Sequence, residues 1–442
     1  MLHHRYHCWG SYPNTPQSGA ELSWPEDLTR LLEAQPEATL LPFGNGRSQG
    51  DVCLNGGGTL AGTLPLDRIH AFDAKNGTMR CDAGVLLSEV LALTVPRGWF
   101  PAVTPGTQFV TVGGAIANDV HGKNHHRVGS YGNQTLRFEL LRSDGSRLIC
   151  SSKENSDWFE ATIGGLGLTG LILWAEIQLV PIHNPLMNQE VLQFENLAGF
   201  FQITEASDAD YAYTLAWVDS RARGAKLGRG ILTRGNHAGP LSISTIRQPS
   251  GRTTFPFRPP FSLVNRLSVS IFNALYYRQL FKQEGCSSSH YIPFFYPLDG
   301  LLHWNRMYGK NGFLQYQCVV PHDQARSAIG ELLDRISKSK AGSFIAVLKK
   351  FGPLPSRGLL SFPRPGVTLA IDFPFHGQKT LALLESLDGV VREAQGAVYP
   401  AKDARMSPES FATFYPEMER FKRYIDPRFS SQLWRRVSGE KT

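Results

Sequence analysis

The stretch from Thr104 to Tyr131 reads Thr-Pro-Gly-Thr-Gln-Phe-Val-Thr-Val-Gly-Gly-Ala-Ile-Ala-Asn-Asp-Val-His-Gly-Lys-Asn-His-His-Arg-Val-Gly-Ser-Tyr. It holds five glycines, three histidines and one lysine, and its apolar residues are mostly small or β-branched. Such a segment packs weakly on its own, and glycine lets a backbone approach a large rigid ligand where a Cβ would collide. The N–H groups that such a loop leaves unpaired can point at phosphates. The stretch therefore predicts a backbone that lies against a bulky ligand bearing phosphate.

Two further glycine-rich stretches flank this one. Residues 44–51 (Gly-Asn-Gly-Arg-Ser-Gln-Gly-Asp) follow a predicted strand at 39–43, and residues 163–172 read Ile-Gly-Gly-Leu-Gly-Leu-Thr-Gly-Leu-Ile. The first loop is not a P-loop, because no Gly-Lys-Ser/Thr follows, and it lacks the third glycine that opens a helix in the Rossmann fingerprint. Alone it is a weak signal, but three such loops in the first part of the chain favour a shared ligand site over unrelated surface turns.

Composition narrows the class of protein. A chain of 442 residues predicts two or three domains, and 42% hydrophobic with 19% charged residues describes a folded globular protein. The net charge of +7 is spread along the chain without a basic run, which favours a phosphate-bearing ligand over nucleic acid. Six cysteines lie far apart without a Cys-x-x-Cys pair, so we expect neither a metal site nor a disulfide framework.

The sequence also indicates where in the cell the protein is expected to act. The N-terminus has no apolar core of a secretory signal, and no run of about 18 apolar residues could span a bilayer. Residues 262–280 are amphipathic, aromatic and basic, so they form either a helix that lies on a membrane face or a helix packed on its own domain. We expect a cytoplasmic protein, with peripheral contact at the inner membrane left open.

The pattern of elements changes after Pro181. Before it, short segments alternate: helices are expected at 25–34, 86–93 and 157–162, and strands at 39–43, 59–66, 78–84, 135–141, 147–150 and 171–180. After it, strands are expected at 211–218, 312–320, 343–349 and 367–373, with long helices at 323–338 and 380–394. This mixture predicts an antiparallel sheet with helices on one face. Residues 240–260 lack periodicity and predict a loop of the kind that often forms a lid.

The three glycine-rich loops resemble the FAD-binding (PCMH-type) domain of the vanillyl-alcohol oxidase type. Over almost the whole chain the sequence more closely resembles the decaprenylphosphoryl-β-D-ribose 2′-oxidase family. The motifs that carry this resemblance are Gly-Arg-Ser-x-Gly-Asp at 46–51, Pro-Gly-Thr…Thr-Val-Gly-Gly-Ala-Ile-Ala at 105–117, Asp-Val-His-Gly-Lys-Asn-His-His at 119–126, Ala-Trp-Val-Asp at 216–219, Tyr-Pro-Leu-Asp at 296–299, Trp-Asn-Arg-x-Tyr-Gly at 304–309, Phe-Leu-Gln-Tyr-Gln at 313–317, Asp-Phe-Pro at 372–374 and Tyr-x-Ala-Lys-Asp-x-Arg at 399–405.

The resemblance implies an α+β fold in three parts. Residues 1–184 would form the PCMH-type FAD-binding domain of two α/β lobes. Residues 185–397 would form a substrate-binding cap domain built on an antiparallel sheet. Residues 398–442 would return to complete the FAD domain.

The resemblance also implies FAD as the cofactor. Many relatives of the wider type tether FAD through a histidine in the first loop, which here reads Arg47-Ser48-Gln49, so we expect non-covalent FAD. The implied cofactor-binding residues are Gly46, Arg47, Ser48, Gly50, Pro105, Gly106, Thr107, Thr111, Gly113, Gly114, Asn118, His121, Gly122, Gly167, Thr169, Gly170, Ile172 and Tyr399.

Oxidation of a secondary alcohol needs a hydride acceptor over the C–H bond and a group that takes the hydroxyl proton. The candidate catalytic residues are Lys402, His121, Tyr399 and Gln317. Lys402 is preferred, because a lysine beside a flavin stabilises the anionic reduced ring; its alternative is a surface salt bridge to Asp403. His121 either positions the substrate hydroxyl or supports the flavin. The candidate substrate-binding residues are Lys123, Trp217, Gln315, Gln317, Lys349 and Lys402.

By resemblance, the activity is FAD-dependent oxidation of the 2′-hydroxyl of a polyprenyl-phosphoryl-β-D-ribose to the 2′-keto sugar. This is the first half of an epimerisation to the arabinose lipid used in cell-wall glycan synthesis, and a separate NAD(P)H-dependent keto-reductase would complete it. Two alternatives stay open: a soluble aldonolactone or alditol oxidase that uses oxygen, and a flavin-binding protein without turnover.

Two positions depart from the family pattern. The family usually carries tyrosine after Arg-Ser in the first loop, where this chain has Gln49. Some members carry a cysteine before Val-Asp-Phe-Pro, where this chain has Ala370. Since that cysteine is not needed for hydride transfer, we expect activity to be kept, and inhibitors that bond to the cysteine to lose their target.

Overall fold

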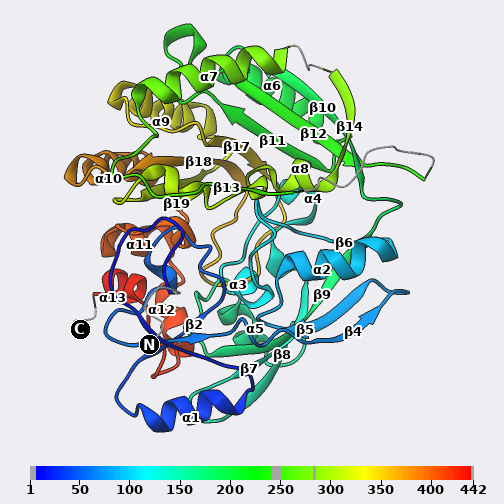
Figure 1. The fold of residues 1–442 in the computed structure, drawn as a ribbon, viewed down its shortest axis with the longest axis vertical. Coiled ribbons are helices and arrows are strands. Elements are labelled where there is room, and N and C mark those ends of the chain that lie inside the picture. Colours follow the sequence, from blue (N-terminus) through cyan, green and yellow to red (C-terminus); the bar gives the residue numbers. More distant parts are fainter. Residues whose placement is uncertain (1–5, 241–250, 282–284, 440–442) are drawn as a thin grey trace.

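The computed structural model describes residues 6–240, 251–281 and 285–439. They form an elongated molecule in which two lobes, built mainly from the first part of the chain, lie below a large sheet with its helices (Figure 1). The strands are arranged in a three-stranded, a six-stranded, an eight-stranded and a two-stranded sheet. This arrangement confirms the expected α+β fold class with an antiparallel sheet above two smaller lobes.

The first lobe contains a parallel sheet whose strands are β1 (Ser18–Glu21), β3 (Thr59–Gly62) and β2 (Leu40–Phe43). Helix α1 (Glu26–Ala34), expected at 25–34, buries Leu28 and Leu32 in this lobe's core. The strand expected at 59–66 is shorter, because the chain turns after Gly62 and the N–H of Leu66 bonds to the carbonyl of Thr63. The first glycine loop leaves the C-terminal end of β2, the end of a parallel sheet where ligands commonly bind.

The second lobe is an antiparallel sheet whose strands are β4 (Ile69–Asp73), β5 (Thr78–Asp82), β6 (Trp99–Pro101), β7 (Thr135–Leu141), β8 (Arg147–Ser151) and β9 (Leu171–Pro181). Its helices are α2 (Leu87–Thr94), α3 (Val112–Ala117), α4 (His125–Val128) and α5 (Ser156–Thr162). Strand β9 pairs with β5, β6 and β7 and carries alternating buried side chains. Helices α3 and α4 lie within the stretch 104–131, whose glycines alone predict only a loop.

The eight-stranded sheet has the order β14 (Gly285–His290), β10 (Leu186–Phe194), β12 (Gly230–His237), β11 (Tyr213–Val218), β17 (Ala346–Phe351), β18 (Gly366–Pro374), β16 (Phe313–Val320) and β19 (Ala397–Val398). All of its neighbouring strands are antiparallel, as the sequence predicts. Its covering helices are α6 (Leu197–Ser207), α9 (Ala325–Ser339) and α10 (Gln378–Glu393). We call this sheet with its helices the cap.

The segment expected to be a loop at 240–260 is only partly described, since residues 241–250 lie outside the described residues. Its second part includes β13 (Thr253–Thr254), which pairs in parallel with β15 (Leu301–Leu302). Helix α7 (Arg266–Phe281) follows and corresponds to the helix considered at 262–280.

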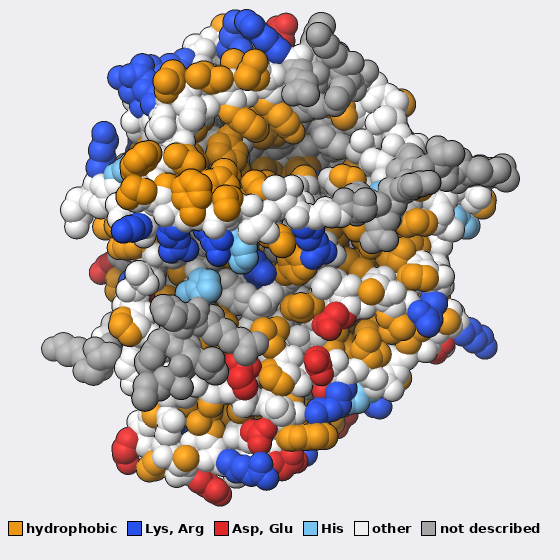
Figure 2. All heavy atoms as spheres, in the orientation of Figure 1, with side chains coloured by type: hydrophobic (Ala, Val, Ile, Leu, Met, Phe, Trp, Pro, Cys, Tyr) orange, Lys and Arg blue, Asp and Glu red, His pale blue; other side chains and the backbone are white. Residues whose placement is uncertain are grey.

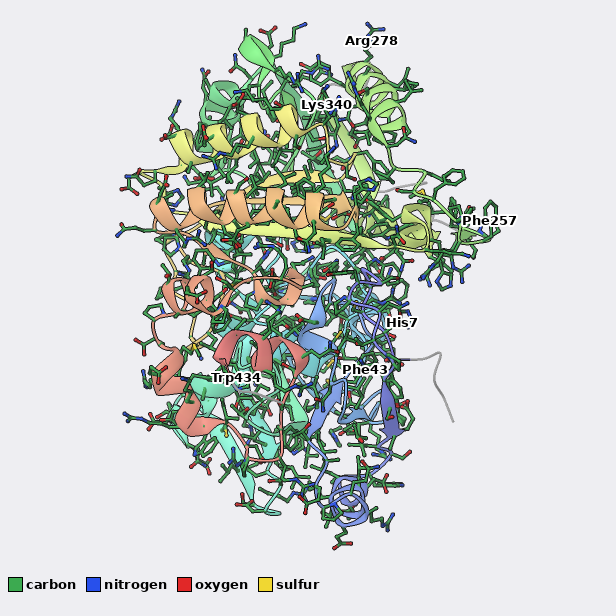
Figure 3. All side chains as sticks on the ribbon, turned by 90° about the vertical axis from the view of Figure 1, so that its left-hand side faces the viewer. His7, Phe43, Phe257, Arg278, Lys340 and Trp434 are labelled. Carbon is green, nitrogen blue, oxygen red and sulfur yellow. The ribbon has the colours of Figure 1, made fainter. Side chains whose placement is uncertain are left out.

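After β19 the chain returns to the lobes, where it forms α11 (Pro408–Phe414), α12 (Met418–Phe421) and α13 (Gln432–Ser438). Trp434 of α13 is almost completely buried in the lower half of the molecule (Figure 3). Arg436 of the same helix bonds to Asp51, 2.8 Å away, and to Asp403, 3.0 Å away. The returning segment is thereby joined by ion pairs to the residue that ends the first glycine loop.

We predict that Gly50→Ala separates the first loop from the returning segment. A Cβ at Gly50 would lie 1.6 Å from the carbonyl oxygen of Asp403, a backbone atom that cannot rotate away. We expect a loss of about 1–3 kcal/mol of unfolding free energy or more, measured as a lower Tm. The matched control is Gly300→Ala, because a Cβ there meets nothing within 4 Å. Equal Tm values for the two variants would contradict this account.

Candidate active site

A cavity of about 420 Å³ lies between the glycine-rich loops and the lobe-facing side of the cap sheet. Its volume is in the usual range of small-molecule sites. The walls come from all three glycine loops, from the C-terminal turn Pro400–Lys402 and from strands β11, β16, β17 and β18. The folded chain thus brings together segments from its beginning, middle and end.

The first glycine loop presents unpaired backbone donors to the cavity. Within the described part of the chain, no protein acceptor bonds to the N–H groups of Gly46, Arg47 and Ser48. Gly46 has φ +60°, and a Cβ there would lie 2.6 Å from the carbonyl oxygen of His7, so only glycine fits. Consecutive free N–H groups in such a turn form a site for an anion such as a pyrophosphate.

Helix α3 forms the second part of this wall. The hydroxyl of Thr111 accepts a hydrogen bond from the N–H of Gly114 at 3.1 Å and caps the helix. A Cβ at Gly113 would lie 2.8 Å from the Cβ of Ala83, so glycine lets the helix pack directly on the neighbouring segment. The buried Oδ1 of Asn118 has no partner among the described residues, although its Nδ2 donates to the carbonyl of Gly114. The wall therefore combines a surface of small residues with a free acceptor.

Two residues expected to bind the cofactor do not line the cavity. Gly50 packs against the backbone of Asp403, as described above. Thr169 is buried, and its hydroxyl lies 3.0 Å from the hydroxyl of Thr162. Both positions serve packing between segments, whereas Gly167 and Gly170 of the third loop do reach the cavity.

The opposite wall follows from strand geometry. Side chains of alternate residues share one face of a strand, which explains why Gln315 and Gln317 of β16 both line the cavity. In the sheet register, Gln315 lies opposite Asp372 and Gln317 lies opposite Ala370. Lys349 of β17 lines the same cavity. The cap thus presents a row of polar side chains to the glycine wall.

Lys402 is the first member of one series of hydrogen-bonded side chains on this wall. Its Nζ donates to Oε1 of Gln315, and Nε2 of Gln315 donates to Oδ1 of Asp372 at 2.5 Å. The hydroxyl of Tyr308 donates to the other carboxylate oxygen at 3.1 Å. Burial lowers the pKa of Lys402 and raises the pKa of Asp372, and the attraction between the two charges opposes both shifts. The alternative salt bridge from Lys402 to Asp403 is not formed; Lys402 lines the cavity instead.

His121 is at the centre of a second series of hydrogen-bonded side chains. Its Nε2 lies 2.9 Å from Nε2 of Gln317, and its Nδ1 lies 3.0 Å from Nζ of Lys349. Burial and the nearby charge of Lys349 hold the pKa of His121 well below its usual value, so the ring is neutral. Nε2 of Gln317 and Nζ of Lys349 both carry N–H groups, so the neutral ring, which has one acceptor nitrogen, accepts from one of them and contacts the other. The ring is therefore held in one orientation between two polar side chains of the cap.

Tyr399 also lines the cavity, but its hydroxyl is engaged elsewhere. It donates to the carbonyl of Asn118 at 2.8 Å, and its ring stacks on Phe362 at 4.5 Å between centroids. Burial raises the pKa of Tyr399 well above its usual value. Tyr399 consequently joins the returning segment to the end of α3.

Three lysines make the cavity cationic. Lys123 donates from Nζ to the carbonyl of Phe294, and burial lowers its pKa to about 7. Burial, together with the charges of Lys402 and Lys123, also lowers the pKa of Lys349 to about 7. Among the described lining residues, Asp299 is the one carboxylate, and it accepts from the N–H of Gln108 at 2.9 Å. An anionic ligand would favour the charged form of these lysines.

Trp217, expected on the floor of the substrate site, lies outside the cavity. Its Nε1 donates to the carbonyl of Phe344 at 2.8 Å, and its ring meets Tyr276 of α7 edge to face at 4.9 Å. The expectation was wrong because α7 covers this end of the sheet. Leu215, two residues earlier on the same strand, lines the cavity instead.

The other predicted site residues do line the cavity. They are Gly46, Arg47, Ser48, Pro105, Gly106, Thr107, Thr111, Gly113, Gly114, Asn118, His121, Gly122, Lys123, Gly167, Gly170, Ile172, Gln315, Gln317, Lys349, Tyr399 and Lys402. Gln49 and Ala370, the two departures from the family pattern, line it as well. Ala370 is a small apolar residue opposite Gln317, so no thiol is present at this point of the wall.

Two groups of residues at the site are absent from the sequence-based predictions. Asp372 and Asp299 each stand in a motif that carries the resemblance, yet neither was assigned a role. The second group is aromatic and apolar and lines the cavity through Trp9, Phe109, Leu298, Leu301, Leu302 and Trp304. These residues come from loops, short 3-10 turns and the two-residue strand β15, which are too short for a periodic pattern to reveal them.

Comparisons with known proteins bear on the identity of the ligand. The FAD binding domain family matches residues 24–151. The decaprenylphosphoryl-beta-D-ribose oxidase of Mycolicibacterium smegmatis is 36% identical over 97% of this chain and 96% of its own length. An uncharacterised protein of Streptomyces coelicolor is 32% identical over 80% of this chain and 100% of its own length. The delta(24)-sterol reductase of Rattus norvegicus is 32% identical over 32% of this chain and 27% of its own length.

The cofactor of the glycine wall is FAD. The unpaired N–H groups of the first loop fit a pyrophosphate, and the surface of small residues along α3 fits the flat face of a flavin. The polar side chains of the cap then face the space beside the cofactor.

Proposed function

Because this chain belongs to the decaprenylphosphoryl-β-D-ribose oxidase family of FAD-dependent oxidoreductases, we propose that it oxidises the 2′-hydroxyl of a polyprenyl-phosphoryl-β-D-ribose to the 2′-keto sugar. The observation that carries this substrate class is the set of three partly buried lysines, Lys123, Lys349 and Lys402, which face the FAD loops. The product passes to a separate NAD(P)H-dependent keto-reductase, which completes the epimerisation to an arabinose lipid for the cell envelope.

The cavity offers a separate surface to each part of this substrate. Lys123 and Lys349 provide cations for the phosphodiester. Gln315 and Gln317 provide donors and acceptors for the ribose hydroxyls. The apolar side chains near Leu301 and Trp304 can contact the part of the polyprenyl chain that is nearest to the phosphate. A free sugar would leave the cations and this apolar wall without a partner.

In the reaction, bound FAD supplies the acceptor for the hydride that leaves the sugar carbon. The chain's own residues hold the substrate and control protons. Lys402 keeps a charge on Nζ that Asp372 balances through Gln315, and this fixed cation stabilises negative charge that develops in the cavity. His121, neutral and held by Gln317 and Lys349, positions the hydroxyl. Lys349 is protonated while it pairs with the phosphodiester, so the neutral ring of His121 is the group left to accept the hydroxyl proton.

We also propose the division of the chain into the FAD-binding domain at 1–184, the cap domain at 185–397 and the returning segment at 398–442. FAD is held without a covalent bond in this proposal, since residues 47–49 include no histidine. The protein acts on the cytoplasmic side, in peripheral contact with the inner membrane that carries its substrate.

Anaerobic reduction of the bound flavin tests the substrate class. We expect bleaching of the yellow protein by a polyprenyl-phosphoryl ribose, because this ligand satisfies both the lysines and the apolar wall. Free pentoses, aldonolactones and alditols are expected to leave the flavin oxidised. Bleaching by a lactone or alditol, or by none of these compounds, would contradict the proposal.

Lys402→Met is predicted to slow flavin reduction by at least about a hundredfold while FAD stays bound, because the fixed cation is lost at nearly constant volume. Stopped-flow absorbance measures the rate, and the flavin spectrum measures occupancy. The matched control is Lys350→Met, since Lys350 pairs with Asp208 and does not line the cavity. A fully active Lys402→Met variant would remove the role given to this lysine.

Substrate affinity is predicted to fall as pH rises above about 7. In the free protein Lys123 and Lys349 lose their protons near this pH, whereas a bound phosphodiester raises their pKa and so requires the protonated form. Affinity is therefore constant below pH 7 and falls by up to about tenfold per pH unit for each lysine above it. A polyprenyl-phosphoryl 2-deoxyribose, which cannot be oxidised at C2, allows Kd to be measured between pH 6 and 9.

Lys349→Met should bind this analogue more weakly at pH 6 and show a shallower pH profile, and Lys350→Met should behave like the unmodified protein. An affinity that rises with pH, or a profile that Lys349→Met leaves unchanged, would contradict the assignment.

A further inference from the structure

Helix α7 and the segment before it expose an unusual amount of apolar surface. Seven of the eleven exposed large apolar side chains in the described residues lie between residues 257 and 275. We call them the apolar patch: Phe257, Phe261, Leu263, Leu267, Ile271, Phe272 and Leu275. Phe257 and Leu267 are 61% and 69% exposed, so these side chains lie in solvent rather than at the edge of a core. Phe257 protrudes from this face of the molecule (Figure 3).

The packing of α7 explains why this surface is not core. Val269 and Asn273 form its buried stripe, and Nδ2 of Asn273 donates to Asp219 at 2.7 Å. Leu267, Ile271 and Leu275 repeat every four residues on another stripe, which points outward. A helix that packs on one domain needs a single apolar stripe. The second stripe has no partner within the described chain.

The charged residues around the patch are basic. Residues 251–281, which carry the patch, contain four arginines and no lysine, aspartate or glutamate. Arg252, Arg258, Arg266 and Arg278 come from the patch segment itself. Figure 2 shows the hydrophobic band of this face with basic and histidine side chains gathered directly below it. Apolar side chains beside a basic fringe fit a bilayer surface that contains anionic lipids.

The patch is also continuous with the cavity. Thr253 and Thr254 pair with Leu301 and Leu302, and the N–H of Leu263 bonds to the carbonyl of Met307. Leu301 and Leu302 line the cavity. The segment that carries the patch is therefore bonded directly to the segment that forms the apolar part of the cavity wall.

We propose that the apolar patch and its arginines dock this protein on an anionic bilayer, with α7 lying in the interface. None of the helices described in residues 6–240, 251–281 and 285–439 has the length and apolar character of a membrane span. A second copy of the chain is disfavoured as the occupant, because a two-fold contact would bring the same arginines together. The inference rests on the proposed function only for the route of the lipid-linked substrate, which would enter from the same bilayer.

Vesicle co-sedimentation of the FAD-bound protein tests the docking surface without any substrate. We expect binding to phosphatidylglycerol/phosphatidylcholine vesicles, weaker binding to pure phosphatidylcholine, and loss of binding at high salt. The triple variant Phe257→Gln/Leu267→Gln/Leu275→Gln should reduce partitioning by about tenfold or more, since glutamine keeps the helix propensity but not the apolar surface. The control is Trp24→Gln/Ile69→Gln/Leu136→Gln, which changes exposed apolar residues of the two lobes.

Equal loss in both triple variants, or no binding to either kind of vesicle, would overturn the proposal. So would a change from dimer to monomer in sedimentation velocity when the patch alone is altered, because the patch would then bind a second copy. Reduction of the flavin by a water-soluble, short-chain substrate separates this inference from the proposed function. The patch variant should keep that reaction, so a failure of the chemistry and a failure of docking give different results.

Discussion

The whole site depends on a group of buried ion pairs that joins the two ends of the chain. Arg436 lies between Asp51, which ends the first glycine loop, and Asp403, which follows Lys402. Burial raises the pKa of Asp51, and the charge of Arg436 offsets only part of this shift. Removal of one partner from such a group leaves an uncompensated buried charge, which is strongly destabilising. The pairs therefore hold Lys402 against the loop that holds the FAD phosphates.

The two walls of the cavity use different properties of the polypeptide. The cofactor wall depends on backbone, since glycines allow close packing and leave N–H groups free for an anion. The cap wall depends on the two-residue repeat of strands, which places Gln315, Gln317 and Lys349 on one face. The cofactor wall thus depends mainly on the positions of its glycines, whereas the chemistry of the cap wall depends on which side chains its strands carry.

The electrostatics of the cavity favour an anionic ligand for a physical reason. Burial of Lys123, Lys349 and Lys402 lowers all three pKa values, so the protein alone carries these charges at a cost in free energy. Asp372 balances Lys402 from within the protein, but Lys123 and Lys349 have no such carboxylate among the groups that set their pKa values. A phosphodiester would supply the missing charge. Outside the cavity, the arginines beside the apolar patch likewise favour an anionic lipid surface.

The sequence alone determined the class of cofactor and the plan of the fold. Glycine spacing, the strand and helix periods after Pro181 and the motifs of the resemblance are local properties, and they predicted the loops, the antiparallel cap and most of the lining residues. Tertiary structure decided which residues meet. It linked Asp372 to Lys402 through Gln315 and directed the side chain of Trp217 toward α7. It also placed Gly50 and Thr169 where they pack against other segments. Burial and charge pairing depend on sheet register and on contacts between distant segments, and no local pattern encodes them.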